Sequence, residues 1–204
     1  MAVGCTVMII RLSQKLAKKL KLGTLPSLPS DENPYADWSA HLFTADRTQY
    51  IILTNTQSLY SVVMYGKGIA DDSRFIGRAL DNISEFMESD GQAFVYRRFI
   101  APASGSVKFG KALNRSVTGS MNDMISHAKH WLIEEELSPY DVGFKLNELP
   151  MSALGYQRPR EAFKLLVGGG EAPSESAASG QLVLEASDAE SKSPGPTINV
   201  PFTY

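Results

Sequence analysis

The run SAHLFTADRTQYIILTNTQSLYSVVMY, residues 39–65, decides the fold class. It contains three segments rich in Ile, Val, Leu, Tyr and Phe, which are residues that favour β-strands. Polar clusters at 45–48 and 55–58 separate these segments and have the composition of hairpin turns. In residues 50–53 and 59–65, apolar side chains occupy both the odd and the even positions. Since these positions point to opposite faces of a strand, the sheet is expected to be partly covered on both faces. The run therefore predicts an antiparallel core of three strands.

Further strands are predicted on both sides of this core. Residues 6–12, TVMIIRL, form a short apolar run with β-branched residues. Downstream, QAFVYRRFI at 92–100 and SGSVKFGKAL at 104–113 have the composition of strands, and Pro102 and Gly105 separate them. Together with the core, these runs predict a largely antiparallel sheet of about five strands.

Two helices with strong apolar periodicity are predicted to pack on this sheet, at 72–89 and 117–136. In both, apolar side chains recur at spacings of three and four, which is the period of one helical face. The first stripe consists of Phe75, Ile76, Ala79, Leu80, Ile83, Phe86 and Met87, and the second of Met121, Met124, Ile125, Ala128 and Leu132. Short helices are predicted after Ser13 and from Pro159, whereas the pattern weakens after Pro139.

These elements place a single α+β domain at residues 8–167. Residues 1–7 have no periodic pattern, and we interpret them as an N-terminal extension. From Gly168 the run GGGEAPSESAASG has the composition of a linker. Residues 168–204 hold five acids against one lysine, so we expect a flexible acidic tail.

The composition excludes several classes of protein. Hydrophobic residues make up 43% of the 204 residues, which is enough for a packed core and excludes global disorder. No apolar run approaches the ~18 residues that a membrane helix needs, so we expect no membrane partner. The single cysteine, Cys5, favours a reducing compartment, and we expect a cytoplasmic protein without a cofactor.

Three phrases carry a resemblance to a known family. They are MIIRLSQKLAKKL at 8–20, FTADRTQYIILTNTQSLYSVVM at 43–64 and RSVTGSMNDM at 115–124. They resemble an uncharacterised bacterial family, a domain of unknown function whose members open with Met-Ile-Ile-Arg and contain a central Arg-Ser-Val-x-Gly-Ser-Met-Asn-Asp phrase. The resemblance covers about 8–166 and implies a start at Met8. It supplies no activity and no catalytic residues.

The phrase NRSVTGSMNDM at 114–124 accompanies the start of the second long helix and has two interpretations. Ser116 and Ser120 are both candidate N-caps, and Asp123 follows Ser120 by three residues, as in a capping box. Alternatively, free backbone N–H groups at the helix start, together with nearby cations, would hold a phosphate or a carboxylate. The residues of this candidate anion site are Lys108, Lys111, Arg115, Gly119 and Ser120.

Two further groups of side chains are candidates for binding. Asp123, His127 and His130 share the polar side of the second long helix and are weak candidates for metal ligands. A solvated polar face explains them more simply, so no metal site is predicted. Basic residues on the first helix and near the sheet are candidates for gripping nucleic acid, namely Lys15, Lys18, Lys19, Arg97 and Arg98. The remaining histidine, His41, lies in a predicted strand, and we interpret it as structural.

Three functions remain open from the sequence. The chain contains no Gly-x-Ser-x-Gly phrase, no dinucleotide fingerprint and no P-loop, and nothing pairs Cys5 with a catalytic histidine. We therefore expect a non-catalytic interaction protein with an unknown protein partner. The alternative is a module that binds nucleic acid, a nucleotide or another anion through the basic N-terminal helix and residues 108–123. The third is a hydrolase with a metal ion at His127.

Overall fold

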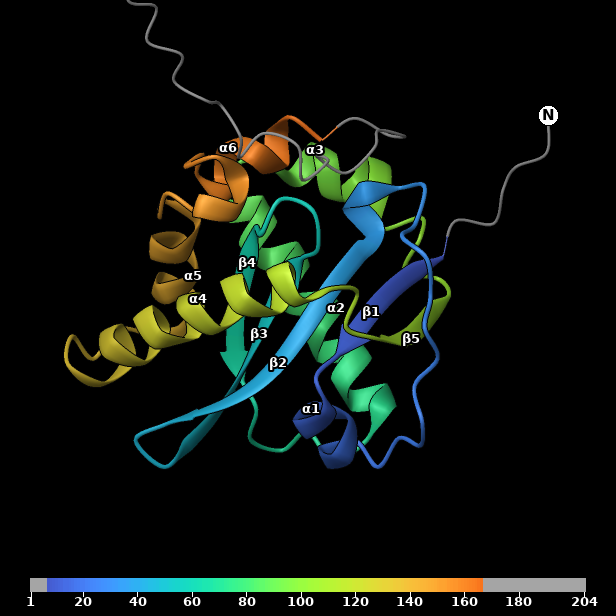
Figure 1. Cartoon of the computed structure of the whole chain (residues 1–204), viewed down its shortest axis with the longest axis horizontal. Helices are drawn as coiled ribbons and strands as arrows, with labels where there is room; N and C mark the ends of the chain where they lie inside the picture. Colours follow the sequence, from blue (N-terminus) through green and yellow to red (C-terminus); the bar gives the residue numbers. More distant parts are fainter. Residues whose placement is uncertain (1–6, 167–204) are drawn as a thin grey trace, which may run out of the picture. The chain divides into compact units, whose positions relative to one another are not determined.

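The computed structural model describes residues 7–166, which form a five-stranded sheet with helices on both faces (Figure 1). The strands are β1 (Met8–Leu12), β2 (Asp37–Ala45), β3 (Thr48–Asn55), β4 (Ser61–Tyr65) and β5 (Val107–Lys111). The helices are α1 (Gln14–Lys19), α2 (Asp72–Ser89), α3 (Ala93–Val95), α4 (Arg115–Ile133), α5 (Pro139–Asn147) and α6 (Pro159–Lys164), with the 3-10 helices η1 (Pro34–Ala36) and η3 (Ser152–Leu154) and the π-helix η2 (Tyr96–Ile100). The predicted tail at 168–204 and nearly all of the predicted extension at 1–7 lie outside the described residues. Among the helices of the described part, none is long and apolar enough to cross a membrane.

The antiparallel core predicted from residues 39–65 is confirmed. Strands β2, β3 and β4 follow one another in the chain and pair as antiparallel neighbours. Between β2 and β3, Asp46 and Arg47 both have positive φ angles, 39° and 62°, which suit a two-residue hairpin turn. Between β3 and β4, the side chain of Asn55 accepts a hydrogen bond from the backbone N of Ser58 at 3.0 Å. The polar clusters in the sequence therefore form the turns that their composition indicates.

The prediction of a largely antiparallel sheet is wrong, because the sheet is mixed. The strand order is β4-β3-β2-β1-β5, and β1 pairs in parallel with both β2 and β5. Parallel neighbours need a connection of about a dozen residues or more. Residues 13–36, which include α1 and a proline-containing loop, carry the chain back so that Asp37 pairs with Ile9. The strand composition of residues 6–12 gives no information about this direction.

The strand predicted at 92–100 is also wrong, since this segment is helical. It forms α3 and then the π-helix η2. The side chains of Gln92 and Ile100 are buried and that of Tyr96 is half-buried, which is a spacing of four residues. Burial in this segment therefore follows the period of a helix. It does not alternate from one residue to the next, as it would in a strand. The strand predicted at 104–113 is confirmed in part as β5.

Helix α4 begins at Arg115, two residues earlier than predicted. Its N-cap is Asn114, whose side chain accepts a hydrogen bond from the backbone N of Val117 at 2.9 Å. Ser120 is therefore an interior helical residue with a buried side chain, and the N-cap role predicted for it is wrong. The segment after Pro139, where the periodicity weakens, also folds as a helix, and Ser138 is the N-cap of this α5.

Each face of the sheet has its own hydrophobic core, so the predicted coverage of both faces is confirmed. One core joins α2 to one face of the sheet. Its largest members include Trp38, Ile51, Leu53, Phe75, Ile83 and Phe86. The other core joins α4 and α5 to the opposite face. Its members include Phe43, Ile52, Val63, Met121, Met124 and Leu146. The side chains of successive strand residues supply the two cores in turn.

The buried face of α2 gives a direct test of this packing. Ile83 has no exposed surface, whereas Leu80 of the same predicted stripe is only half-buried. Ile83→Ala should lower the free energy of unfolding by about 2–5 kcal/mol, because it leaves a cavity between helix and sheet. Arg78→Ala should cost well under ~1 kcal/mol, since Arg78 is exposed and its guanidinium donates a single hydrogen bond within the described residues, to the backbone O of Lys67 at 2.7 Å. Urea denaturation measures both changes, and similar losses would show that the assigned face is wrong.

A buried ion pair holds the loop between β1 and β2 against the sheet. Arg11 donates to both carboxylate oxygens of Asp37, from Nε at 2.8 Å and from Nη2 at 2.7 Å. The same guanidinium donates to the backbone O of Leu28 at 2.9 Å and to that of Pro29 at 2.8 Å. Asp37 also accepts a hydrogen bond from the hydroxyl of Thr56 at 2.9 Å. The loop is thereby fixed next to the groove described below.

Candidate anion-binding groove

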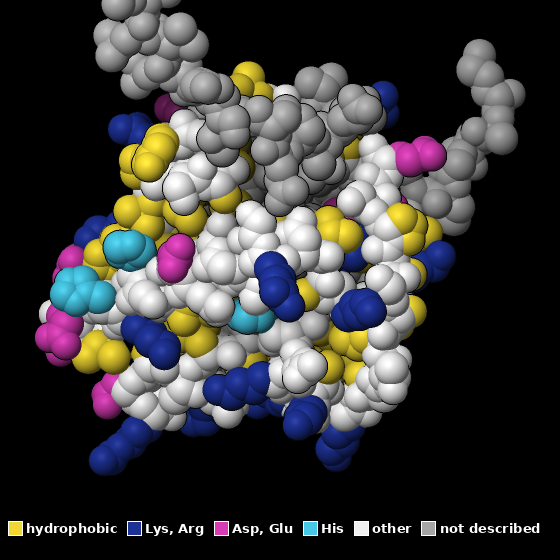
Figure 2. All heavy atoms as spheres, viewed as in Figure 1, with side chains coloured by type: hydrophobic (Ala, Val, Ile, Leu, Met, Phe, Trp, Pro, Cys, Tyr) yellow, Lys and Arg dark blue, Asp and Glu magenta, His cyan; other side chains and the backbone are white. Residues whose placement is uncertain are grey.

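A groove of about 940 Å³ opens beside α1, near the ends of the parallel strands β1 and β5. Leu12 and Lys111, the last residues of these strands, line it together with His41 of β2 and Thr118 of α4. The segment around α1 supplies Ser13, Gln14, Ala17, Lys18, Leu22, Gly23, Thr24 and Leu25. Figure 2 shows this side of the molecule, where Lys and Arg side chains gather over the region that α1 and the start of α4 occupy in Figure 1.

Helix α1 presents Lys18 to the groove because its apolar side faces the core. Leu16 and Leu20 are almost completely buried, whereas Lys18 is exposed. Ser13 is the N-cap of the helix, and its hydroxyl accepts a hydrogen bond from the backbone N of Leu16 at 3.3 Å. The short helix predicted after Ser13 is thus confirmed, and its amphipathic pattern directs one lysine of the basic run to the groove.

The end of β5 is fixed by contacts with the loop that follows α1. The backbone N of Lys111 donates to the backbone O of Pro26 at 3.0 Å. The preceding residue, Gly110, lies against Leu28, and a Cβ there would come within 3.2 Å of the Leu28 Cδ1 atom. Glycine therefore allows the loop to approach the strand closely. The exposed side chain of Lys111 lines the groove together with that of Lys18, although the two residues are far apart in the sequence.

His41 projects from the face of β2 that α4 covers, as Phe43 does two residues later. Its side chain is half-buried, and burial lowers its pKa below the ordinary value of 6.5. At pH 7 the imidazole is therefore mainly neutral, with one nitrogen as a donor and the other as an acceptor. His41 adds a hydrogen-bonding ring to the groove but little charge.

The groove lining combines cations, hydroxyl groups and apolar side chains, and the part of the chain that the structure describes contributes no Asp, Glu or Cys to it. Lys18 and Lys111 make the local potential positive. Leu22 and Leu25 add partly exposed apolar surface, and Thr118 adds a hydroxyl group. A lining of this kind suits a ligand with an anionic group and an apolar body. The described residues of this lining offer no carboxylate or thiol for acid–base or nucleophilic chemistry.

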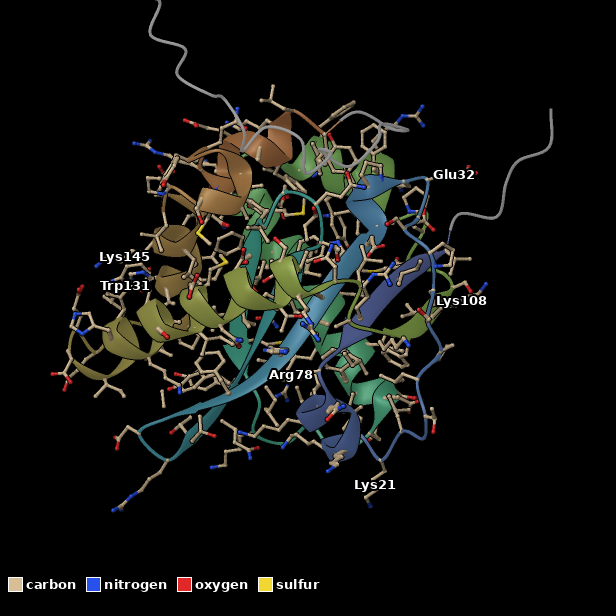
Figure 3. The ribbon with its side chains drawn as sticks, viewed as in Figure 1. Lys21, Glu32, Arg78, Lys108, Trp131 and Lys145 are labelled. Atoms are coloured by element: carbon tan, nitrogen blue, oxygen red, sulfur yellow. The ribbon has the colours of Figure 1, made fainter. Side chains whose placement is uncertain are left out.

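The structure separates the residues of the anion site predicted around the start of α4. Lys111 lines the groove. Lys108 is exposed three residues earlier on β5 and does not line the groove (Figure 3). Arg115 and Gly119 are exposed in the first turns of α4, outside the groove lining, and Ser120 is buried. Only one of the five predicted residues therefore reaches the groove.

The residues predicted to grip nucleic acid fall into two separate groups. Lys18 lines the groove, whereas Lys15 is exposed outside the lining and Lys19 donates to the side chain of Gln49 at 2.6 Å. The other two lie on η2, which continues α3 at the opposite end of the sheet from α1 (Figure 1). There, Arg97 pairs with Glu88 at 3.4 Å, and the Arg98 guanidinium lies 5.9 Å from the ring centre of Phe99.

The weak metal candidates lie along the exposed side of α4. Asp123, His127 and His130 are all exposed, and the ring of His127 stacks on that of Trp131 with centres 5.7 Å apart. Trp131 also lies beside Lys145 of α5, whose ammonium is 5.1 Å from the ring centre (Figure 3). Within residues 7–166, no three His, Cys, Asp or Glu side chains come together as a metal site would require.

Sequence reasoning missed most of the groove lining. His41 and Thr118 have no local pattern that distinguishes them from structural residues. Strand alternation alone would have placed His41 on the same face as Phe43, but not in a groove beside α1. The parallel pairing of β1 with β5 brings Lys111 near the helix that carries Lys18, and this pairing is absent from the sequence pattern.

Comparison with known proteins identifies a family but no activity. No curated protein shows a significant match to the chain. Residues 9–162 match a family model that is described as a domain of unknown function, DUF6933. This range includes nearly all of the three phrases that resemble an uncharacterised family. Since the match spans most of the 204 residues, the chain belongs to the DUF6933 family.

Proposed function

We propose that this protein is a non-catalytic binding module whose groove takes an anionic ligand. The observation that carries the proposal is the position of Lys18 and Lys111 in one groove whose lining, within residues 7–166, contains no acidic residue. These two lysines come from segments far apart in the sequence, and both are exposed. An ammonium without a carboxylate partner in the same groove leaves a positive potential that a phosphate or a carboxylate can neutralise.

The chemistry of the lining favours binding without catalysis. Ser13 is already engaged as the N-cap of α1, so its hydroxyl is not an unpaired nucleophile. Burial lowers the pKa of His41 below its ordinary value, and among the described residues of the lining no carboxylate orients its imidazole. We propose that the protein is located in the cytoplasm, because a chain with Cys5 as its single cysteine suits a reducing compartment.

Ligand-induced stabilisation tests the proposed function. Thermal melts of the wild-type protein with millimolar inorganic phosphate, nucleotides or carboxylates should show a higher melting temperature for at least one of these anions. A ligand at ~100 times its dissociation constant adds ~2.7 kcal/mol to the free energy of unfolding. Lys18→Ala and Lys111→Ala should each abolish most of the shift while leaving the melting temperature without ligand nearly unchanged, since both side chains are exposed.

The chain offers a matched control for each of these lysines. Lys15 is exposed on the same helix as Lys18, and Lys108 is exposed on the same strand as Lys111, but neither lines the groove. Lys15→Ala and Lys108→Ala should therefore keep the ligand-induced shift. Equal losses in all four variants would indicate a general charge effect, and no shift with any anion would refute the proposed function.

A further inference from the structure

We propose that the ligand of this groove is a mononucleotide, bound with its phosphate between Lys18 and Lys111 and its base on the adjacent apolar surface. This inference rests on the proposed function and names the class of ligand. A mononucleotide is proposed in place of two other ligands, an inorganic anion and a nucleic-acid strand. Three features of the groove support it, namely its mixed lining, the amount of positive charge and the arrangement of cations around it.

The mixed lining favours an organic phosphate over an inorganic one. Beside the two lysines, the lining includes the half-buried side chains of Leu22 and Leu25. Inorganic phosphate would leave this apolar surface in contact with water, whereas a planar base would cover it. The volume of about 940 Å³ lies within the range of ~300–1,000 Å³ that is typical of pockets for small organic ligands.

The charge of the lining matches one phosphate group. A phosphate monoester carries about −1.5 to −2 charges at pH 7, and the two ammonium groups of Lys18 and Lys111 balance it. His41 remains mainly neutral because burial lowers its pKa. A neutral imidazole can donate one hydrogen bond and accept one, which suits the polar edge of a base or a ribose hydroxyl group.

Two of the cations predicted to bind nucleic acid are engaged elsewhere and do not extend the charge of the groove. A protein that grips a nucleic acid commonly neutralises about six to ten phosphates. Here, Lys19 is engaged with Gln49, Arg97 is paired with Glu88, and η2 lies at the opposite end of the sheet from α1 (Figure 1). The two lysines of the lining therefore match a single phosphate, and the arginines of η2 lie too far along the sheet to add to them.

Titration calorimetry with defined probes tests this inference. The probes are AMP, GMP, CMP and UMP, together with inorganic phosphate, adenosine and a single-stranded 12-mer oligonucleotide. At least one mononucleotide should bind at least tenfold more tightly than inorganic phosphate and at least tenfold more tightly than adenosine, because only a nucleotide uses both parts of the groove. The oligonucleotide should bind no more tightly than the best mononucleotide.

Variants separate the two parts of the groove. Leu25→Ser should weaken nucleotide binding at least fivefold and leave phosphate binding unchanged, whereas Lys111→Ala should weaken both. Leu113→Ser is the matched control for Leu25→Ser. Leu113 is a partly exposed leucine two residues after Lys111, but it does not line the groove. The melting temperature of each variant without ligand shows whether it is folded.

The outcomes distinguish this inference from the proposed function. If phosphate binds as tightly as every nucleotide and Leu25→Ser has no effect, the groove is an anion site and the nucleotide inference is wrong. If the 12-mer binds at least tenfold more tightly than each mononucleotide, the occupant is a strand. If none of the probes or the carboxylates tested above binds, the proposed function itself is wrong.

Discussion

Replacing Arg11 with alanine should lower the free energy of unfolding by about 3–5 kcal/mol. The side chains of Arg11 and Asp37 are only 1% and 2% exposed, so the substitution leaves a buried carboxylate without its partner. It also removes the donors to the backbone O atoms of Leu28 and Pro29. Urea denaturation, monitored by circular dichroism, measures the loss.

Two further variants show whether the unpaired charge is the cause. Arg11→Lys keeps the positive charge but cannot form the two-pronged contact with Asp37, so it should lose an intermediate amount of stability. The double variant Arg11→Met and Asp37→Leu removes both charges and should recover much of the loss of Arg11→Ala, because apolar residues can replace a buried ion pair. A loss below ~1 kcal/mol for Arg11→Ala would contradict the assigned burial.

The same ion pair connects the fold with the proposed binding site. Arg11 holds the loop at Leu28 and Pro29, and this loop approaches Gly110 and bonds to the backbone of Lys111. Loss of Arg11 should therefore weaken ligand binding as well as stability, since the groove wall would no longer be fixed. The phrase Met-Ile-Ile-Arg at 8–11 thus has a structural explanation, in which three buried apolar residues build the interior strand β1 and the arginine anchors the loop.

The sequence predicts elements well where the pattern is local. The hairpins of residues 39–65 and the helix at 72–89 appear at nearly the predicted positions, because turn composition and apolar period are both read over a few residues. The sequence does not predict that β1 pairs in parallel with its neighbours, because pairing is a long-range property. The segment at 92–100 shows the same limit, since its short apolar run fits a strand or a helix equally well until its packing is known.

The candidate site was less predictable than the fold for a related reason. The phrase NRSVTGSMNDM suggests a helix start, and a helix does start there, but Asn114 caps it and Ser120 is buried. The groove instead depends on Lys18, Lys111 and His41, which meet only after β1, β5 and β2 have paired. A basic helix is visible in the sequence, whereas the choice of Lys18 over Lys15 requires the position of α1 against the sheet.

The short helix α6 is integrated into the fold through one aromatic side chain. Phe163 has no exposed surface, and its ring stacks on that of Tyr60 with centres 4.4 Å apart. It also makes edge contacts with Tyr35 at 5.2 Å and with Trp38 at 6.4 Å between ring centres. Tyr60 in turn donates from its hydroxyl to the buried carboxylate of Asp90 at 2.8 Å. A six-residue helix is marginal by itself, so these contacts determine whether α6 is formed.

Phe163→Ala should therefore lower the free energy of unfolding by about 3–5 kcal/mol, because it removes a fully buried ring and leaves a cavity among three other aromatic side chains. Leu165→Ala, in the same segment, should change it by less than ~0.5 kcal/mol, since Leu165 is 65% exposed. Urea denaturation of both variants measures the difference, and amide hydrogen exchange shows whether α6 opens before the sheet. The family match ends at residue 162, one residue before this ring. A small effect of Phe163→Ala would mean that the domain is stable without α6, whereas the expected loss would extend the cooperative unit through Phe163.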